Sequence, residues 1–397
     1  MSQADVLLSP AGARLLGRLR GVAVTPGQEL ALSAELRADY PPDLVAAALT
    51  QQALRTAARP KFSRADDMLF TRAGLEQASS ELTAAHSARR FAGLDLVADL
   101  CCGIGGNLTA LAVAARRVVG VDTDLDALRF AGHNAAVLGA TADVAFARAD
   151  VRDLSYGGAP VAAVFIDPAR RAAGRRLRTG DSEPPLRWCC ALARPVSRVC
   201  IKAAPGLDHG LVPAGWEAEF VATGRALKEA LLWSPAFATT PRRATVLPTG
   251  ATLVADAGEP VPVADPGEYL LDPNPAVTRA GLVQELGREL SAWQLDPMTA
   301  FLSLDRIVST PFARTLRVVE SMPWHERAVA GRLRELGIGT VDIRRRGLAG
   351  DVDLIRRRLR LRGDRAAIIV LTRRADQPWG LICEAVGGQA ADPGASP

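Results

Sequence analysis

Short apolar runs alternate with helix-like segments between residues 61 and 250. Segments such as 107–115 and 124–138 carry apolar residues at helical spacing. The strand-like runs that they connect are 95–99, 117–121, 142–147, 161–166 and 198–201. Short apolar strands joined by helices predict a mostly parallel sheet that is covered on both faces. The expected fold class of this region is therefore α/β.

The rest of the chain has different patterns. The N-terminal region carries helical patterns only, the last of which is predicted to begin with Asp43 as its cap. Beyond residue 216 strand-like runs follow one another without helices, which predicts an antiparallel end to the sheet. The predicted domain organisation is a helical domain over 1–60, an α/β domain over 61–255, a Pro- and Gly-rich linker over 256–268, a small α+β domain over 269–386 and a tail over 387–397.

The composition says more about the cellular compartment of the protein than about its function. Only three of the 48 basic residues are Lys, and this Arg bias is typical of a GC-rich genome, so the net charge of +5 is weak support for a nucleic-acid partner. Four of the six Cys form adjacent pairs, a poor arrangement for disulfides, which favours a reducing cytoplasm. The chain has no signal-like start, no stretch of 18 apolar residues and no His-rich ligand cluster. We therefore expect no membrane span and no metal.

The segment VADLCCGIGGNLT, which begins at Val97, combines a strand end, a glycine loop and the start of a helix. Gly103 and Gly105 allow the backbone to turn tightly and to approach a ligand. The helix that follows directs free N–H groups at the same space. Asp99 lies at the carboxyl end of its strand, where open α/β sheets bind their ligands. The pattern therefore predicts a ligand site at this turn.

The loop alone does not identify its ligand. Such turns bind NAD, FAD or S-adenosylmethionine (SAM), or bind nothing. Cys101 in place of a first glycine disfavours a dinucleotide, and the lack of Gly-Lys-Ser/Thr excludes a P-loop. Asp122 ends the second strand, where an acid suits ribose hydroxyls. Asp150 follows the third strand, and Asp167 opens the sequence DPAR after the fourth.

This series of acids resembles the class I SAM-dependent methyltransferases. In that family the glycine loop holds methionine, the acid of strand two holds ribose, the acid after strand three faces adenine, and the Asp-Pro pair lies beside the methyl group. The resemblance implies SAM as the cofactor and a Rossmann-like sheet. The residues that it places at the cofactor are Asp99, Cys101, Gly103, Gly105, Asn107, Asp122, Thr123, Asp150, Val151 and Asp167.

Further stretches resemble RNA methyltransferases. DLCCGIG, His133-Asn134 and DPAR are similar to enzymes that modify carbon 5 of uracil. EQASSELTAA resembles a helix that folds over SAM in several RNA methyltransferases, which places Ser80 and Glu81 at the cofactor; a plain helix cap with a surface acid is the alternative. LEQASSELTA, IDPARR, IKAAPGLD and YLLDPNPAVTRAG resemble the bacterial SAM-dependent methyltransferases with a THUMP-like C-terminal domain. THUMP domains in related enzymes bind structured RNA.

Two chemistries remain open. For an amine acceptor, Asp167 and the carbonyl of Pro168 would accept its N–H, and Arg170 could stack on the base or meet a phosphate. For carbon 5 of a pyrimidine, Cys200 would be the nucleophile. Cys200 lies in an apolar strand pattern without the Cys-Asn-Pro sequence of that family, which favours packing. Lys202 is either a pocket cation or a lysine that reaches solvent.

The C-terminal segment 341–374 carries eleven Arg against four Asp, a net charge of +7. The expected elements are a strand, a helix over 351–359 and a second strand. The predicted RNA contacts are Arg344, Arg345, Arg346, Arg356, Arg357 and Arg358, with a solvated helix face as the alternative. The motif YLLDPN, from Tyr269 to Asn274, is either a docking loop onto the catalytic domain or a plain turn.

The function predicted from these features is SAM-dependent methylation of a base in tRNA or rRNA. One alternative is an RNA-binding protein with a relict SAM fold. Cys101 and the DPAR sequence suggest it, because both depart from the pattern of active enzymes. Another is a methyltransferase for a small molecule or a protein, which the arginine-rich C-terminal domain disfavours.

Overall fold

The computed structural model describes residues 2–22, 26–156, 158, 160–169, 171–172, 175–176, 182–348 and 350–386. The chain forms two compact units, of which the first is Met1–Ala218 with Glu229–Thr239 and the second is Glu219–Lys228 with Thr240–Pro397. The domain boundaries expected from the sequence stay predictions. The expected tail over 387–397 lies outside the described residues.

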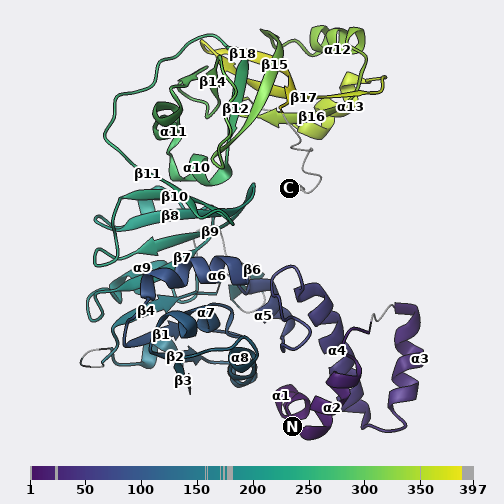
Figure 1. The fold of residues 1–397 in the computed structure, drawn as a ribbon, viewed down its shortest axis with the longest axis vertical. Coiled ribbons are helices and arrows are strands. Elements are labelled where there is room, and N and C mark those ends of the chain that lie inside the picture. Colours follow the sequence, from purple (N-terminus) through teal and green to yellow (C-terminus); the bar gives the residue numbers. More distant parts are fainter. Residues whose placement is uncertain are drawn as a thin grey trace. The chain divides into compact units, whose positions relative to one another are not determined.

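The first unit begins with four helices: α1 (Gln3–Leu7), α2 (Pro10–Arg18), α3 (Pro26–Leu36) and α4 (Pro42–Ala58) (Figure 1). Ser2 and Ser9 cap the first two through their hydroxyls. The expectation that Asp43 caps the fourth helix is wrong. The N-cap is Pro41, two residues before Asp43, and it makes no side-chain hydrogen bond. A proline needs no N–H partner in the first turn, so no polar cap is required.

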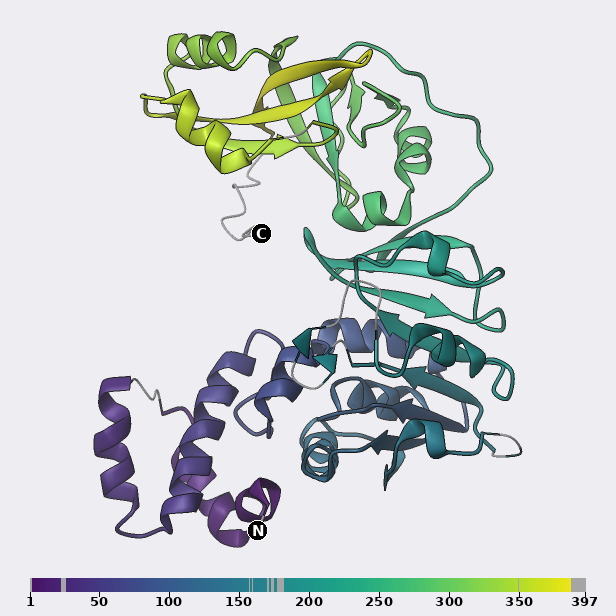
Figure 2. The ribbon, with the colours of Figure 1, turned by 180° about the vertical axis from the view of Figure 1, so that it is seen from behind.

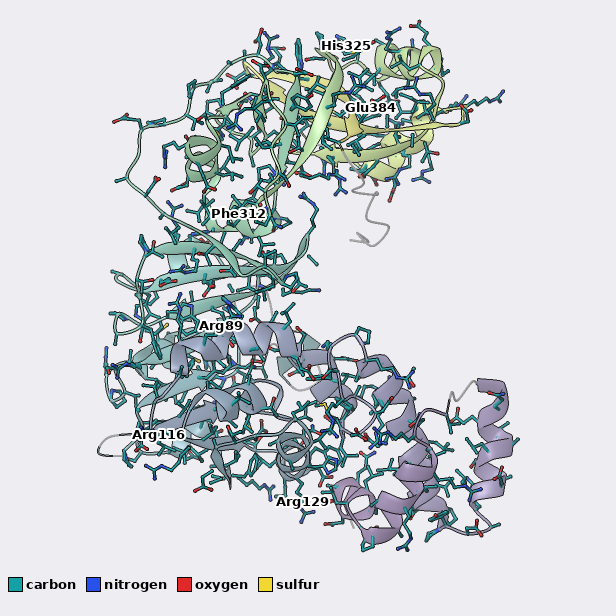
Figure 3. All side chains as sticks on the ribbon, viewed as in Figure 1. Arg89, Arg116, Arg129, Phe312, His325 and Glu384 are labelled. Carbon is teal, nitrogen blue, oxygen red and sulfur yellow. The ribbon has the colours of Figure 1, made fainter. Side chains whose placement is uncertain are left out.

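These helices share one apolar core with the α/β region. Leu15 and Val45 of the helices pack in the same cluster as Ile104 and Phe130, which come from the glycine loop and from the helix after the second strand. Arg129 of that later helix also pairs with Asp5 (Figure 3). The N-terminal helices are therefore part of the body that carries the glycine loop.

The α/β region matches the predicted class. Its elements are α5 (Arg72–Gln77), α6 (Glu81–Ala88), η1 (Arg89–Phe91), β1 (Leu96–Leu100), α7 (Gly106–Ala114), β2 (Arg117–Asp122), α8 (Leu125–Val137), β3 (Asp143–Arg148), η2 (Val151–Asp153), β4 (Ala163–Ile166), β5 (Arg171–Ala172), β6 (Arg175–Arg176), α9 (Leu186–Ala191), β7 (Val199–Ala203) and η3 (His209–Leu211). Strands β1, β2, β3, β4 and β7 are parallel, and β9 (Ala226–Trp233) runs antiparallel beside β7.

The order of these strands within the first unit is β9-β7-β4-β1-β2-β3. The chain moves outward from β1 to β3, returns to β4 on the other side of β1, and continues to β7. The strand order therefore reverses between β1 and β4, where open α/β sheets bind ligands at the carboxyl ends of their strands. Val97, Leu100 and Phe165 are fully buried there. This burial on both faces agrees with near-continuous apolar runs in the sequence.

The second unit contains mainly antiparallel strands. Its elements are β8 (Glu217–Thr223), β10 (Arg242–Leu247), β11 (Ala251–Val254), β12 (Tyr269–Pro273), α10 (Pro275–Ala280), α11 (Val283–Leu290), β13 (Trp293–Gln294), β14 (Leu302–Leu304), β15 (Ala313–Pro323), α12 (Glu326–Glu335), β16 (Ile338–Arg345), α13 (Val352–Leu359), β17 (Arg365–Arg374) and β18 (Gln377–Ala385), although β8 starts in the first unit. The larger sheet has the order β13-β14-β12-β15-β18-β17-β16. Helices α12 and α13 contact β16 (Figure 2).

The motif YLLDPN binds a neighbouring hairpin turn. It forms β12, and Asp272 accepts from Arg225, which lies in the turn between β8 and β9. Asn274 donates through Nδ2 to the carbonyl of Gly224 at 2.8 Å, while its Oδ1 caps α10. The motif is therefore a buried strand of the second unit, paired with β14 and β15, and neither of the two alternatives describes it.

Candidate active site

The loop after β1 has a left-handed backbone at three positions. The φ angles are 60° at Cys101, 52° at Gly103 and 86° at Gly105. Gly105 is the N-cap of α7, and a Cβ there would lie 3.1 Å from the Cβ of Ala131. Glycine adopts this conformation at little cost, whereas the thiol-bearing residue is strained in it. Cys101 therefore occupies a position at which a glycine would also fit.

Asp122 fixes this loop to the end of β2. The N–H of Gly103 donates to Oδ2 of Asp122 at 2.9 Å, and the N–H of Asp124 donates to Oδ1 at 3.0 Å. Asp124 in turn caps α8. A carboxylate has about four acceptor sites, so Asp122 can still accept from a ligand.

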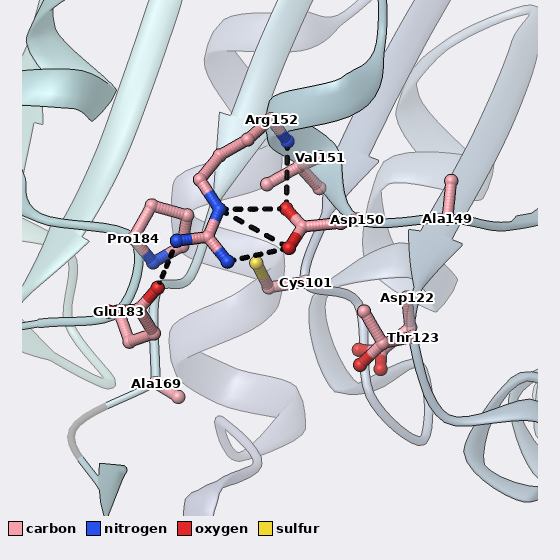
Figure 4. A pocket seen from close by; sticks show the side chains of 10 residues that line it. All are labelled: Cys101, Asp122, Thr123, Ala149, Asp150, Val151, Arg152, Ala169, Glu183 and Pro184. Atoms are coloured by element: carbon pink, nitrogen blue, oxygen red, sulfur yellow. Dashed lines mark hydrogen bonds and ion pairs between the residues drawn. The ribbon is translucent and has the colours of Figure 1, made fainter.

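A cavity of about 240 Å³ opens beside this loop (Figure 4). Its lining residues are Cys101, Asp122, Thr123, Ala149, Asp150, Val151, Arg152, Ala169, Glu183 and Pro184. Five of these are residues that the sequence placed at a cofactor. The other expected cofactor residues do not line this cavity, and sequence reasoning missed Arg152, Glu183 and Pro184. An isolated backbone bridge joins Ala169 to Glu183 and brings Glu183 and its neighbour Pro184 to the cavity. No periodic pattern in the sequence predicts such a bridge.

Arg152 forms a bridge within this cavity (Figure 4). Its Nη2 lies 2.6 Å from Oδ2 of Asp150, and its Nη1 lies 2.6 Å from Oε1 of Glu183. The hydrogen bonds from Arg152 lower the pKa of Asp150 to about 2. Cofactor-sized sites commonly exceed about 300 Å³. Arg152 therefore occupies the side of the cavity next to Asp150 and joins two of its acidic lining residues.

Asp167 and Lys202 form an ion pair at the ends of β4 and β7. Nζ of Lys202 lies 2.6 Å from Oδ2 of Asp167 and 3.5 Å from the carbonyl oxygen of Gln77. The Lys202 side chain is 8% exposed and the Asp167 side chain 25%. Lys202 is therefore a buried cation of the site and not a solvated strand-end lysine.

Asp99 lies beneath the same region without a partner. It is fully buried, and neither carboxylate oxygen has a hydrogen-bond donor among the described residues. Burial raises its pKa well above the ordinary value, the charges of Asp167 and Asp122 add to this, and Lys202 opposes it. A buried carboxylate without donors is costly, and an ammonium group from a ligand would supply the missing partner.

Ser80 and Glu81 lie outside the first cavity. Ser80 caps α6, and its hydroxyl accepts from the N–H of Thr83 at 3.3 Å. Glu81 accepts from the N–H of Ser63 at 2.9 Å and lines a second cavity between α6 and α7. This geometry is that of the helix cap with a surface acid, the alternative raised for the sequence EQASSELTAA.

The remaining expected residues are either buried or lie outside the described part of the chain. Asn107 is buried in the first turn of α7. Pro168 is buried next to Asp167, and Arg170 lies outside the described residues. Cys200 is fully buried within β7, between Phe165 on β4 and Trp233 on β9. Cys200 therefore belongs to the core. In the described part of the chain, no group of three or more His, Cys, Asp or Glu is placed to hold a metal ion.

Comparison with known proteins decides the family. An uncharacterized S-adenosylmethionine-dependent methyltransferase of Mycobacterium tuberculosis, present in strains CDC 1551 and H37Rv, is 41% identical over 314 residues, which is 77% of this chain and 84% of the relative. The chain belongs to the SAM-dependent methyltransferases. Family models of an RNA cap guanine-N2 methyltransferase, a THUMP-like domain and a domain of unknown function match residues 94–178, 313–385 and 2–58 of this methyltransferase.

A solved structure shares the fold of this methyltransferase. The crystal structure of a protein from Porphyromonas gingivalis W83, assigned as a methyltransferase, has a TM-score of 0.74 at 20% identity. The match covers 92% of this chain and all of that chain. Together with the M. tuberculosis relative, it confirms the expected class I sheet and the THUMP-like C-terminal region. None of the described helices is both long and apolar enough to span a bilayer.

The site of this methyltransferase fits SAM, the cofactor of its family. Asp122 has acceptor sites left for ribose hydroxyls, and the carboxylate of Asp99, which lacks a donor among the described residues, suits an ammonium group. An added Cβ at Gly103 would meet nothing within 4 Å, so the loop leaves open space there. The site has five acidic side chains, Asp99, Asp122, Asp150, Asp167 and Glu183, against the two cations Lys202 and Arg152. Even without a charge on Asp99 the site is net negative, which suits a sulfonium cofactor.

Replacing Asp122 by Ala is expected to weaken SAM binding. The change removes a charged acceptor for ribose and frees the Gly103 N–H, so the loss should be about 1–3 kcal/mol, or roughly 5–150-fold in Kd. Isothermal titration calorimetry measures it. Asp126→Asn on the exposed first turn of α8 is the control and should bind as the wild type does. Equal affinity of Asp122→Ala and wild type would contradict this assignment.

Asp99→Asn is expected to change how stability depends on pH without SAM. Because the pKa of Asp99 is raised, the folded protein holds a proton there that the unfolded chain releases. Stability therefore falls as pH rises from the ordinary carboxyl pKa of about 4 to the raised value. The variant should flatten this decline in thermal denaturation scans at successive pH values, and it should bind SAM more weakly. A decline as steep as in the wild type would show that other groups cause it.

Proposed function

We propose that this methyltransferase methylates a base in structured RNA, either tRNA or rRNA. The observation that carries the proposal is the arginine face of α13, within the segment that matches a THUMP-like domain. Arg356, Arg357 and Arg358 are all exposed on this helix. The match of residues 94–178 to an RNA cap guanine-N2 methyltransferase supports the same substrate class.

The arginines of α13 are available to an external anion. Arg356 pairs with Asp353 at 2.6 Å on the same helix, and Arg358 lies 3.8 Å from Glu326, with side-chain exposures of 47% and 58% for the two arginines. Exposed ion pairs contribute little to stability, so phosphate can replace these carboxylates at small cost. Guanidinium groups bind phosphate through paired N–H bonds.

The six arginines expected to contact RNA form two groups. Arg345 is exposed on β16 and donates to the carbonyl of Leu348. Arg344 and Arg346, by contrast, are only partly exposed and bind Asp342 and Asp272. We therefore assign the direct, exchangeable RNA contacts to Arg345 and the α13 face.

The proposed cofactor contacts follow the geometry of the first cavity. Asp122 would hold the ribose, Asp150 and Val151 the adenine, and the Gly103–Gly105 loop with Asp99 the methionine part. Bound SAM supplies a methyl group on a positively charged sulfur. The protein's task is then to hold the acceptor in line with that group, and alignment of this kind is worth about 7–11 kcal/mol.

Asp167 is the proposed catalytic residue, and an exocyclic amine is the acceptor that it suits. Its carboxylate would accept an N–H of the amine and orient the nitrogen lone pair, with the carbonyl of Pro168 as a second acceptor. Lys202 holds one oxygen of Asp167 at 2.6 Å and so fixes the orientation of its carboxylate. Carbon 5 of a pyrimidine is disfavoured, because the thiol of Cys200 is buried within β7 and cannot reach a base.

Labelling tests the reaction and the role of Asp167 together. Total RNA from a strain that lacks the gene is incubated with the enzyme and isotope-labelled SAM, and mass spectrometry of nucleosides identifies the product. We expect label in one modified nucleoside and a rate about 100- to 10,000-fold lower for Asp167→Asn. SAM affinity should change much less. Asp95→Asn, an exposed acid that pairs with Arg117, is the control. Label found only in protein or small molecules would overturn the RNA substrate.

Removing charge from α13 should weaken RNA binding without affecting SAM. The triple variant Arg356→Gln, Arg357→Gln, Arg358→Gln loses up to three phosphate contacts, so the slope of log affinity against log salt should fall by roughly 2–3. Electrophoretic or fluorescence titration with tRNA at several salt concentrations measures this slope. The control triple Arg18→Gln, Arg37→Gln, Arg59→Gln removes the same charge from the N-terminal helices. If both triples change the slope equally, α13 is not the contact.

A further inference from the structure

The second unit contains a buried group of charged side chains that the proposed contacts do not use. We name it the Asp272 cluster, and its members are Arg225, Asp272, Arg314, Asp342, Arg344 and Arg346. They come from the β8–β9 turn, from β12 and β15, and from β16 and its carboxyl end. Four guanidinium groups face two carboxylates, so the cluster carries a net charge of +2.

The two carboxylates are already engaged. Asp272 is almost fully buried and accepts from Nη2 of Arg225 at 2.7 Å and from Nη2 of Arg346 at 3.2 Å. Asp342 accepts from Nε of Arg344 at 3.0 Å. Three of the four arginines therefore have a carboxylate partner at hydrogen-bond distance.

Arg314 has no such partner. It is 5% exposed, and its Nε and Nη2 are buried without a hydrogen-bond acceptor among the described residues. The nearest carboxylate oxygens belong to Asp342 and Asp272, at 3.7 Å and 4.0 Å from Nη2, beyond hydrogen-bond distance. A buried guanidinium without acceptors is costly, and such groups in native proteins commonly mark the place of a water or an ion. An acceptor is therefore missing from this cluster.

The rim of the cluster is open to solvent. The side chains of Arg225, Arg344 and Arg346 are 24%, 25% and 27% exposed. Burial lowers the pKa of Arg225, and the negative charge of Asp272 opposes this effect. The positive charges of Arg314, Arg344 and Arg346 lower the pKa further. Arg346 also lies over the ring of Phe301, 5.4 Å from its centroid, which restrains its guanidinium. An anion at this rim would relieve the repulsion among the arginines.

The charge and the donors of the cluster match a phosphoryl group. A phosphate monoester carries −1.5 to −2 at pH 7, close to the excess of the cluster, whereas a carboxylate or a phosphodiester carries only −1. It also offers three acceptor oxygens to guanidinium N–H groups. We propose that the Asp272 cluster binds a phosphoryl group, with Arg314 as the buried donor and Arg344 and Arg346 at the rim. That the group belongs to an RNA rests on the proposed function; the site itself does not.

Part of the cluster also has a structural role, which limits the choice of variants. Asp272 and Arg225 hold the β8–β9 turn on β12, together with the bond from Asn274 to Gly224. Substitution of either would disturb this turn. Arg314→Met instead keeps the aliphatic volume and removes a charge without hydrogen-bond partners, and Arg344→Gln alters only the rim.

Inorganic phosphate tests the site directly on the full-length protein. Phosphate should raise the melting temperature of the wild type and of Arg317→Gln, a control on the same strand whose partner is Glu384 (Figure 3). Arg314→Met and Arg344→Gln should each lose at least tenfold in phosphate affinity by calorimetry while keeping SAM binding. If Arg314→Met does not fold, Arg344→Gln carries the test. Equal phosphate binding by wild type and Arg344→Gln, or none by wild type, would overturn the proposal.

RNA of one sequence with a 5′-phosphate or a 5′-hydroxyl then identifies the source of the group. A terminal phosphate at the cluster predicts that the hydroxyl form binds several-fold more weakly to wild type and Arg317→Gln, and that Arg344→Gln shows no difference. If the two RNAs bind the wild type with the same affinity, and both bind Arg344→Gln more weakly than the wild type, the cluster holds an internal phosphate. If phosphate binds but neither RNA does, the phosphoryl site stands and the RNA function fails.

Discussion

The candidate active site depends on the backbone turn that follows β1. Three left-handed residues, Cys101, Gly103 and Gly105, reverse the chain within five positions and start α7 at the point where the strand order changes direction. The hydrogen bond from Gly103 to Asp122 fixes this turn to the neighbouring strand. A second bond, from the N–H of Cys102 to the carbonyl of Val121 at 3.1 Å, joins the loop to the same strand, so the loop and the acid at the end of β2 keep a defined spacing.

The molecule has two sites of opposite net charge. The first cavity and its surroundings hold five acidic side chains against Arg152 and Lys202, and one of these acids, Asp99, has no donor among the described residues. The Asp272 cluster has the opposite imbalance, with Arg314 lacking an acceptor. Each imbalance is costly in the isolated protein. Each would be compensated by the ligand that its chemistry suits, a cationic cofactor in one and an anionic group in the other.

The sequence determined the fold class, because apolar periodicity is a local property of the chain. The five strands of the parallel region begin and end within two residues of their predicted positions, and α7 and α8 within one. It also determined which acids end these strands, and hence that Asp122 and Asp150 share one edge of the sheet. The N-cap of α4 was predicted two residues late, at Asp43 instead of Pro41, because Pro42 serves in the first turn without a polar cap.

Only the tertiary structure decided the partners of the charged side chains. Lys202 could have reached solvent, but strand β7 places it against Asp167, and Glu183 joins the cavity through an isolated backbone bridge. Arg344 and Arg356 look alike in the sequence, yet one lies in a buried cluster and the other on an exposed helix face. Such pairings join residues far apart in the chain, so they depend on how the strands are ordered. Local sequence patterns carry no information about that order.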